Sequence, residues 1–258
     1  MSDAPGDERA LSFGSVAAAY ERHRPGYPDD VVSEVVAYAG RPVRTALEIG
    51  AGTGKATRVF ARHGITVTAT DPDPEMLTEL RRHVPPTVVT VTAGLEGLPL
   101  TADFDLVFAA ASLHWTDPAH RWPRVAGMLA PGGVFASFGG QVHLADDEQA
   151  RAFGAVLAAY DVDDDVPSPD GTAADGPLQW PGTELRGSDL FTDVRQTTIP
   201  RRLTMSSDDY VGHLSTISAY LVLPEAVRRT VLGRIRGVLG DDVVLSADIT
   251  LHLARRTA

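Results

Sequence analysis

Apolar and polar positions follow two different rhythms along the first half of the chain. Short runs of apolar and β-branched residues have the length of buried strands, and the stretches between them repeat apolar residues at helical spacing. The predicted strands are residues 45–49, 65–70, 87–92, 104–110 and 133–138. The predicted helices between them are residues 55–62, 74–83 and 119–129. This alternation predicts an α/β fold with a parallel sheet, helices on both faces and right-handed crossovers.

The second half of the chain departs from this alternation. Residues 148–160 predict a helix, and residues 161–181 are rich in Asp, Pro and Gly, which is typical of a solvated acidic loop. The acidic run 163–165 lacks the alternating spacing of a calcium-binding loop. Residues 193–199 and 246–253 predict two closing strands. The helices predicted between those strands are residues 207–219 and 224–239.

Three alternating glycines follow the first predicted strand, in the sequence TALEIGAGTGK of residues 45–55. Glycines at a strand-to-helix turn bring backbone N–H groups close to a polar ligand. A phosphate-binding P-loop does not fit, because Ile49 stands at its first glycine and Ala56 at its hydroxyl position. A dinucleotide fingerprint needs a glycine where Lys55 stands. The pattern present is E-x-G-x-G-x-G over residues 48–54, which predicts a nucleotide-like cofactor; a structural turn alone needs one glycine.

An acidic residue ends the second predicted strand. Asp71 lies 21 positions after Gly50, the separation that one strand–helix–strand step requires. Its carboxylate can accept hydrogen bonds from ribose hydroxyls, although an Asp before a proline can also begin a turn or cap a helix. Asp73, followed by Pro74, has the better pattern for a helix cap. We therefore assign Asp71 to ribose and Asp73 to capping.

Composition limits the remaining function classes. The 258 residues carry a net charge of −11 and contain no cysteine, which excludes a broad nucleic-acid surface, a disulfide framework and a thiol nucleophile. No apolar run approaches membrane-spanning length, and the acidic N-terminus is unlike a secretion signal, so we expect a cytoplasmic protein without a membrane partner. His143, His213 and His252 lack ligand-like spacing, so no metal is expected. We expect a monomer or a homodimer.

Four sequence blocks carry a resemblance to a known family. They are FGSVAAAY with RPGYP (residues 13–20 and 24–28), the glycine loop with DP and ML (71–72 and 76–77), EGLP (96–99), and LHW with LAPGG (113–115 and 129–133). With these blocks the chain resembles the class I methyltransferases that depend on S-adenosylmethionine (SAM), and among them the branch that includes trans-aconitate methyltransferase and related bacterial small-molecule methyltransferases. The resemblance covers residues 13–139 well and residues 189–256 loosely.

The resemblance implies a Rossmann-like sheet of seven mostly parallel strands, an N-terminal lid helix and a helical insertion after the fifth strand. It implies transfer of a methyl group from SAM to an O, N or C atom of a small organic acceptor, with S-adenosylhomocysteine as product. Two alternatives stay open. The first is carboxyl methylation of a small acid held by Arg22, Arg24 or Arg201-Arg202, and the second is SAM binding without transfer.

Within one domain we expect a tail with a lid, a SAM-binding core, an inserted cap for the acceptor, and closing strands and helices. These four stretches are residues 1–28, 29–144, 145–188 and 189–258.

The same resemblance assigns cofactor contacts to single positions. Glu48 is the acidic residue of the motif, and the backbone of Gly50, Ala51 and Gly52 would lie against the methionine and ribose parts of SAM. Asp71 would hold the ribose hydroxyls.

The adenine and the methyl group would lie on the neighbouring strand ends. Pro72 and Met76 would flank the adenine. The family often has an Asp for the adenine amino group, but this chain has Gly94, which leaves the Leu95 backbone and Glu96 for that contact. The residues that would border the sulfonium and the methyl group are Ala109 and Ala110.

The lid and the motif after the fourth strand supply the candidates for chemistry. Tyr20 either closes over the cationic sulfonium or only packs, and Arg24 can pair with the SAM carboxylate. His114 either takes a proton from the acceptor or hydrogen-bonds the lid, and Trp115 either contacts the acceptor or belongs to the core. We expect the acceptor pocket between the lid, these two residues, the region 148–187 and the helix near 207–223.

Overall fold

A seven-stranded sheet forms the larger part of the computed structural model, which describes residues 16–100, 103–164, 168–173 and 175–257. Its strand order is β3-β2-β1-β4-β5-β10-β7. The strands are β1 (Thr45–Ile49), β2 (Thr66–Asp71), β3 (Val89–Thr92), β4 (Phe104–Ala110), β5 (Leu129–Gly139), β7 (Phe191–Ile199) and β10 (Ile249–Arg256). Strands β1 to β5 pair in parallel, and β10 runs antiparallel to both β5 and β7. The predicted Rossmann-like, mostly parallel sheet is therefore confirmed.

Both faces of the sheet are buried at its central strands β1, β4 and β5, where neighbouring apolar residues point to opposite faces. Phe108 packs in the cluster under α3 (Asp30–Ala39) and α4 (Thr57–Arg62). Val107 packs in the opposite cluster, under α6 (Arg121–Met128) and α8 (Gly182–Arg186). Helix α5 (Pro74–Leu80) closes the β2 end of the sheet, and the Asp73 side chain accepts a hydrogen bond from the Glu75 backbone N–H at 2.8 Å. The predicted cap is confirmed.

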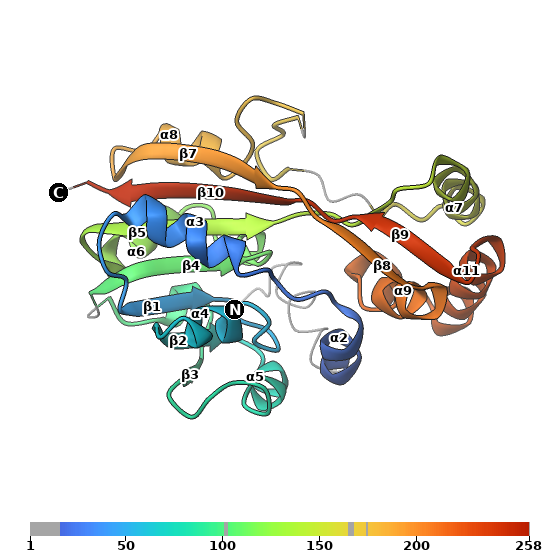
Figure 1. Cartoon of the computed structure of the whole chain (residues 1–258), viewed down its shortest axis with the longest axis horizontal. Coiled ribbons are helices and arrows are strands. Elements are labelled where there is room, and N and C mark those ends of the chain that lie inside the picture. Colours follow the sequence, from blue (N-terminus) through green and yellow to red (C-terminus); the bar gives the residue numbers. More distant parts are fainter. Residues whose placement is uncertain (1–15, 101–102, 165–167, 174, 258) are drawn as a thin grey trace.

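A second sheet of three short antiparallel strands was not predicted. It consists of β6 (His143–Leu144), β9 (Asp242–Ser246) and β8 (Arg202–Ser206), in the order β6-β9-β8. The helices around it are α7 (Asp147–Ala159), α9 (Ser207–Leu214), α10 (Ser218–Leu221) and α11 (Glu225–Val238). Figure 1 shows this second unit at the opposite end of the molecule from the core of the main sheet.

The chain reaches the second sheet through extensions of the two closing strands. Strand β8 begins three residues after β7 ends, and β9 ends three residues before β10 begins. The predicted strand 246–253 is therefore divided between the two sheets at Ala247 and Asp248. Strands of five residues with only two or three apolar positions are too short to stand out from the sequence pattern.

Helix α2 (Ala17–His23) lies between the two units, near α5 on one side and α9 on the other (Figure 1). It contains Tyr20 of the predicted lid. Residues 13–15 of the N-terminal motif lie outside the described residues, with the rest of 1–15. In the part of the chain that the structure describes, no helix has the length and apolar character needed to cross a membrane.

Candidate active site

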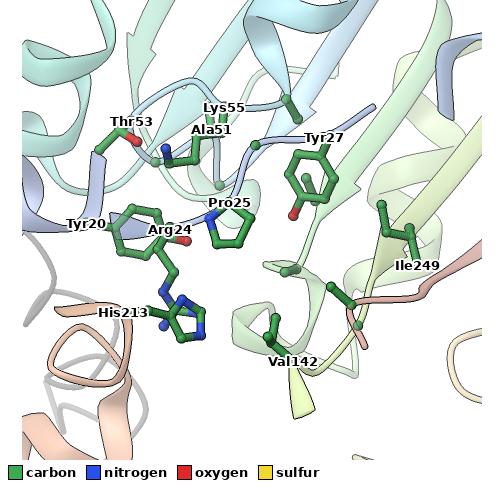
Figure 2. Close-up of a pocket in the computed structure, with 18 of the residues that line it drawn as sticks. Tyr20, Arg24, Pro25, Tyr27, Ala51, Thr53, Lys55, Val142, His213 and Ile249 are labelled. Carbon is green, nitrogen blue, oxygen red and sulfur yellow. The ribbon is translucent and has the colours of Figure 1, made fainter. Parts of the chain in front are cut away.

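A cavity opens beyond the carboxyl ends of β1 and β4, where the main sheet meets the second unit. One wall is the glycine loop with Glu48, and the N-terminal segment from Tyr20 to Tyr27 lies across it. The far wall comes from the second unit and its connections, and includes Arg201 and His213. Figure 2 shows Tyr20, Arg24 and Pro25 between the glycine loop and His213, with Tyr27 on the opposite side of the cavity. This is the edge at which parallel α/β sheets bind ligands.

The glycine loop has a left-handed backbone at all three glycines. The φ angles are +64° at Gly50, +55° at Gly52 and +83° at Gly54, a region that residues with a Cβ disfavour. A Cβ at Gly50 would lie 2.6 Å from the Cβ of Ser112, which anchors the loop by donating to the Ile49 carbonyl at 2.5 Å. At Gly52 a Cβ would meet nothing within 4 Å. At Gly50 and Gly54 a side chain would therefore collide with neighbouring side chains, whereas Gly52 faces open space.

Asp71 fixes the glycine loop from the end of β2. Its side chain is 8% exposed, and Oδ2 accepts a hydrogen bond from the Gly52 N–H at 2.8 Å. Oδ1 accepts from the Asp73 N–H at 2.9 Å. Burial raises the pKa of Asp71, although both backbone hydrogen bonds lower it. Each carboxylate oxygen has a second lone pair for a ligand hydroxyl. The sequence placed Asp71 beside the loop but did not reveal its bond to Gly52.

Glu48 presents an unsatisfied polar atom at the cavity. The side chain is 0% exposed, and Oε2 accepts a hydrogen bond from the Thr57 hydroxyl at 2.5 Å. Among the described residues, Oε1 has no hydrogen-bond partner. Burial, reinforced by the charge of Asp71 and opposed by the Thr57 bond, raises the pKa of Glu48 to about 8. Buried polar atoms are nearly always satisfied, so an orphaned oxygen in a cavity wall marks a place for a ligand donor.

Helix α2 is tied to the glycine loop through Glu21, which the sequence analysis missed. Its carboxylate accepts hydrogen bonds from the Thr53 hydroxyl and from Arg58, both at 2.7 Å. Lys55 lies 3.5 Å from the same carboxylate and donates to the Glu21 carbonyl at 2.7 Å. Burial raises the pKa of Glu21, but these partners outweigh it and hold the pKa below its ordinary value. The ionised cluster therefore holds α2 against the loop.

Arg24 connects the same helix to the second unit. Its Nε donates to the Thr216 hydroxyl at 2.9 Å, and Nη2 donates to the Thr216 carbonyl at 3.1 Å. The guanidinium also lies 5.1 Å from the centre of the Tyr20 ring. Tyr20 and Arg24 both line the cavity, and their role as a lid stays a prediction.

We call the part of the cavity lining that lies away from the glycine loop the outer wall. Three polar side chains, Tyr27, Arg201 and His213, contribute to it from different sides of the cavity. Tyr27 packs edge-on against Phe138, with ring centres 5.0 Å apart, and its hydroxyl points into the cavity (Figure 2). Burial is the main reason that the pKa of Tyr27 is raised, so the hydroxyl keeps its proton. Arg201 donates from Nη1 to the Gly26 carbonyl at 2.6 Å, and burial lowers its pKa. His213 completes this wall.

Several predicted positions lie beside the cavity and do not line it. The residues predicted to contact the adenine lie at the ends of β2 and β3. Met76 and Leu95 are buried, whereas Pro72 is exposed. Gly94 precedes the turn Leu95–Gly97, and the Glu96 carboxylate accepts a hydrogen bond from the Asp117 N–H at 2.8 Å. At the end of β4, Ala110 lines the cavity, whereas Ala109 is fully buried in the core.

His114 and Trp115 also lie outside the cavity lining. They occupy the turn η3 (Leu113–Trp115) after β4, with ring centres 4.7 Å apart. Burial, together with the charge of Arg121, lowers the pKa of His114 to about 4. The ring is therefore neutral at physiological pH. Tyr27, Arg201 and His213 line the outer wall of the cavity instead, and the sequence had singled out only Arg201 of these as a ligand candidate.

No group of three or more side chains suited to a metal ion occurs in the described ranges of the chain.

Comparisons with known proteins agree with this geometry. Residues 47–137 match the family model described as "Methyltransferase domain". An uncharacterized methyltransferase of Mycobacterium tuberculosis is 44% identical over 127 residues, which cover 49% of this chain and 51% of that protein. A trans-aconitate 2-methyltransferase of Methylobacterium radiotolerans is 35% identical over 96 residues, 36% of each chain. The chain spans about half the length of the first curated relatives that it matches. The fold is shared with a putative type II methyltransferase from Anaeromyxobacter dehalogenans, with a TM-score of 0.61 and 24% identity over 90% of this chain and 97% of that one.

Proposed function

We propose that the chain is a SAM-dependent methyltransferase acting on a small organic acceptor, because residues 47–137 match the methyltransferase domain model and the fold is shared with a putative methyltransferase. The observation that carries this proposal is the glycine-loop end of the cavity, where Gly52 faces open space and the buried Oε1 of Glu48 has no partner among the described residues. The rest of the cavity, which the outer wall lines, would hold the acceptor.

The residues at the glycine loop fit the cofactor. SAM supplies a methyl group on a cationic sulfonium, and its amino acid part carries an ammonium and a carboxylate. The ammonium is the donor that the orphaned Glu48 oxygen lacks, and Arg24 retains guanidinium donors for the carboxylate. Asp71 keeps free lone pairs for the ribose hydroxyls. The adenine would lie near Met76 and Leu95 at the ends of β2 and β3.

The residues of this chain contribute orientation and exclusion of water. Helix α2 is held on one side by Glu21 and on the other by Arg24, so Tyr20 is kept over the glycine-loop end of the cavity. Methyl transfer is an in-line displacement, for which alignment in a site closed to water is the main requirement. His114 as a general base stays a prediction. With a pKa of about 4 it would be a weak base at neutral pH.

The surroundings of Arg201 favour a second, narrower candidate function, which is the methylation of a small organic acid. Its guanidinium is half-buried, and no carboxylate of the described residues forms an ion pair with it. A partly buried cation without a counter-charge is costly, and an anionic acceptor would supply that charge. The Tyr27 hydroxyl faces the same space and stays protonated, so it could donate a second hydrogen bond to an acceptor carboxylate.

Methyl-labelled SAM incubated with the chain and a small-molecule extract tests the proposal. We expect label in an organic product, and binding of S-adenosylhomocysteine with release of a proton at pH 7. Proton release follows because an ammonium beside Glu48 lowers its pKa from about 8. Calorimetry in two buffers of different ionisation enthalpy measures the proton, and Glu48→Gln should abolish it. Tight binding without transfer to any acceptor would favour a SAM-binding protein that is not a methyltransferase.

A further inference from the structure

One buried histidine of the second unit faces the cavity with its hydrogen-bonding capacity unused. His213 lies on α9 and is 3% exposed, yet it lines the cavity. Among the described residues its Nδ1 has no hydrogen-bond partner. Leaving a buried polar group unsatisfied costs free energy, and a ligand that forms a hydrogen bond to that group removes the cost.

A second buried histidine shows what purely structural packing looks like in this molecule. His252 on β10 is also 3% exposed, and burial lowers its pKa to about 4. Its Nε2 lies 2.9 Å from the Gln196 side-chain oxygen, within hydrogen-bond distance. The two histidines are equally buried, but only His213 lines the cavity and leaves a ring nitrogen without a partner.

The His213 ring is held in place without using its nitrogens. The backbone carbonyl of His213 accepts hydrogen bonds from the Thr216 N–H at 3.1 Å and from the Thr216 hydroxyl at 2.7 Å. Thr216 in turn accepts both hydrogen bonds of Arg24. The ring also stacks on Tyr210, with centres 6.2 Å apart and planes 12° apart. A ring fixed in this way can position a ligand, because its orientation is set before the ligand binds.

The surroundings of His213 keep it uncharged. Burial, followed by the charges of Arg24 and His23, lowers its pKa to about 3. Figure 2 shows the ring beside the Arg24 side chain, on the side of the cavity opposite Tyr27. A neutral imidazole offers one donor and one acceptor. Arg24 and Arg201 make this part of the cavity electropositive, and the carboxylate among its lining residues here belongs to Asp248, which is exposed.

We propose that His213 is the residue that positions the acceptor, by a hydrogen bond from its neutral ring to an oxygen atom of the acceptor. The cations around it restrict the acceptor to uncharged or anionic molecules and disfavour ammonium compounds. This assignment rests on the proposed methyltransferase function and names the acceptor class for that same cavity. It places the selection of the acceptor in the second unit, apart from the loop that binds the cofactor.

The test uses the full chain, methyl-labelled SAM and the small-molecule extract, with three variants. His213→Phe keeps an aromatic ring but removes the hydrogen bond, His213→Asn keeps a neutral hydrogen-bonding group, and His252→Asn is the control for changing a buried histidine. We expect His213→Phe to lose label transfer at limiting extract at least tenfold, mainly through KM. His213→Asn should recover most of that loss, and His252→Asn should retain transfer. Binding of S-adenosylhomocysteine should change less than threefold in all three.

Each outcome decides between the hypotheses. No label transfer by the unsubstituted chain would refute the methyltransferase function, and this inference with it. Transfer by the unsubstituted chain that His213→Phe leaves unchanged would overturn the role of His213 alone. Loss of S-adenosylhomocysteine binding in both His213 variants would show that the histidine supports the fold or the cofactor site, and would overturn its role in positioning the acceptor. A labelled product that is retained on a cation exchanger at pH 7 would refute the predicted acceptor class.

Discussion

Replacing Glu48 with glutamine should remove most of a pH dependence that this one side chain gives to the stability of the fold. Glu48 is fully buried, and its pKa is raised from the ordinary value of 4.5 to about 8. A glutamine has the shape of the protonated acid, and its oxygen can still accept the hydrogen bond from Thr57. It cannot ionise, so it does not acquire the cost of a buried charge.

The sign follows from the direction of this pKa change. Because the folded chain holds the proton more tightly than the unfolded chain, stability is highest below pH 4.5 and is lost as the pH rises towards about 8. At about 1.4 kcal/mol for each pKa unit, the whole change amounts to about 5 kcal/mol. Between pH 6.5 and 8, the part open to measurement, the loss is about 2 kcal/mol. Each of the three histidines whose pKa is lowered gains about 0.4 kcal/mol of stability over the same range, because the unfolded chain, in which their pKa is the ordinary 6.5, loses its last imidazole protons there. The contribution of Glu48 is therefore measured as the difference between the unsubstituted chain and Glu48→Gln, which share these histidines.

Urea unfolding at pH 6.5, 7.25 and 8 measures this change as a shift in the free energy of unfolding. The unsubstituted chain should lose about 2 kcal/mol relative to Glu48→Gln over this range. Glu34→Gln, on the exposed face of α3, is the matched control and should follow the unsubstituted chain. Equal slopes for Glu48→Gln and the unsubstituted chain would show that Glu48 is already ionised at pH 6.5, which would refute the reasoning.

Three further substitutions test the rest of the site. Asp71→Ala should weaken S-adenosylhomocysteine binding at least tenfold by calorimetry, and unchanged affinity would remove the ribose assignment. Glu21→Ala should raise the acylation rate of Lys55, the only lysine of the sequence, about fivefold, because the ion pair of about 1 kcal/mol between the two side chains is lost. An unchanged rate, read by peptide mass spectrometry, would contradict the role of the Glu21 carboxylate in holding α2 against the glycine loop. If His114 is the general base, His114→Asn should lower kcat about 100-fold and remove an acid limb near pH 4 from the pH–rate profile. An unaltered profile would show that His114 only packs in the fold.

The cofactor end of the site could be read from the sequence because its parts are local. Residues 45–54 form a strand followed at once by its glycine turn, and Asp71 ends the next strand one crossover later. Strand length, glycine spacing and the separation of about 20 residues are properties of short segments, so the sequence displays them directly. The same applies to Asp73, whose capping role depends only on its two following residues.

The second sheet could not be read in this way. Its strands β8 and β9 are five residues long and lie 36 residues apart in sequence, and neither shows more than a few alternating apolar positions. Their pairing depends on packing against the buried residues of α9, α10 and α11, which is a long-range effect. The interpretation of residues 246–253 as one strand failed for the same reason, because the division at Ala247 and Asp248 follows from pairing with two different sheets.

The sequence by itself determined the fold of the first half, the glycine loop and the position of Asp71 beside that loop, since each depends on spacing within a few dozen residues. Only the tertiary structure decided which groups line the outer wall of the cavity. Tyr27, Arg201 and His213 come from segments that lie up to 186 positions apart, and the second unit brings them to one cavity. Burial then set their protonation, and the missing partners of Glu48 and His213 became visible only where every neighbour was in place. Burial and hydrogen-bond satisfaction depend on the whole packed chain, so no local pattern records them.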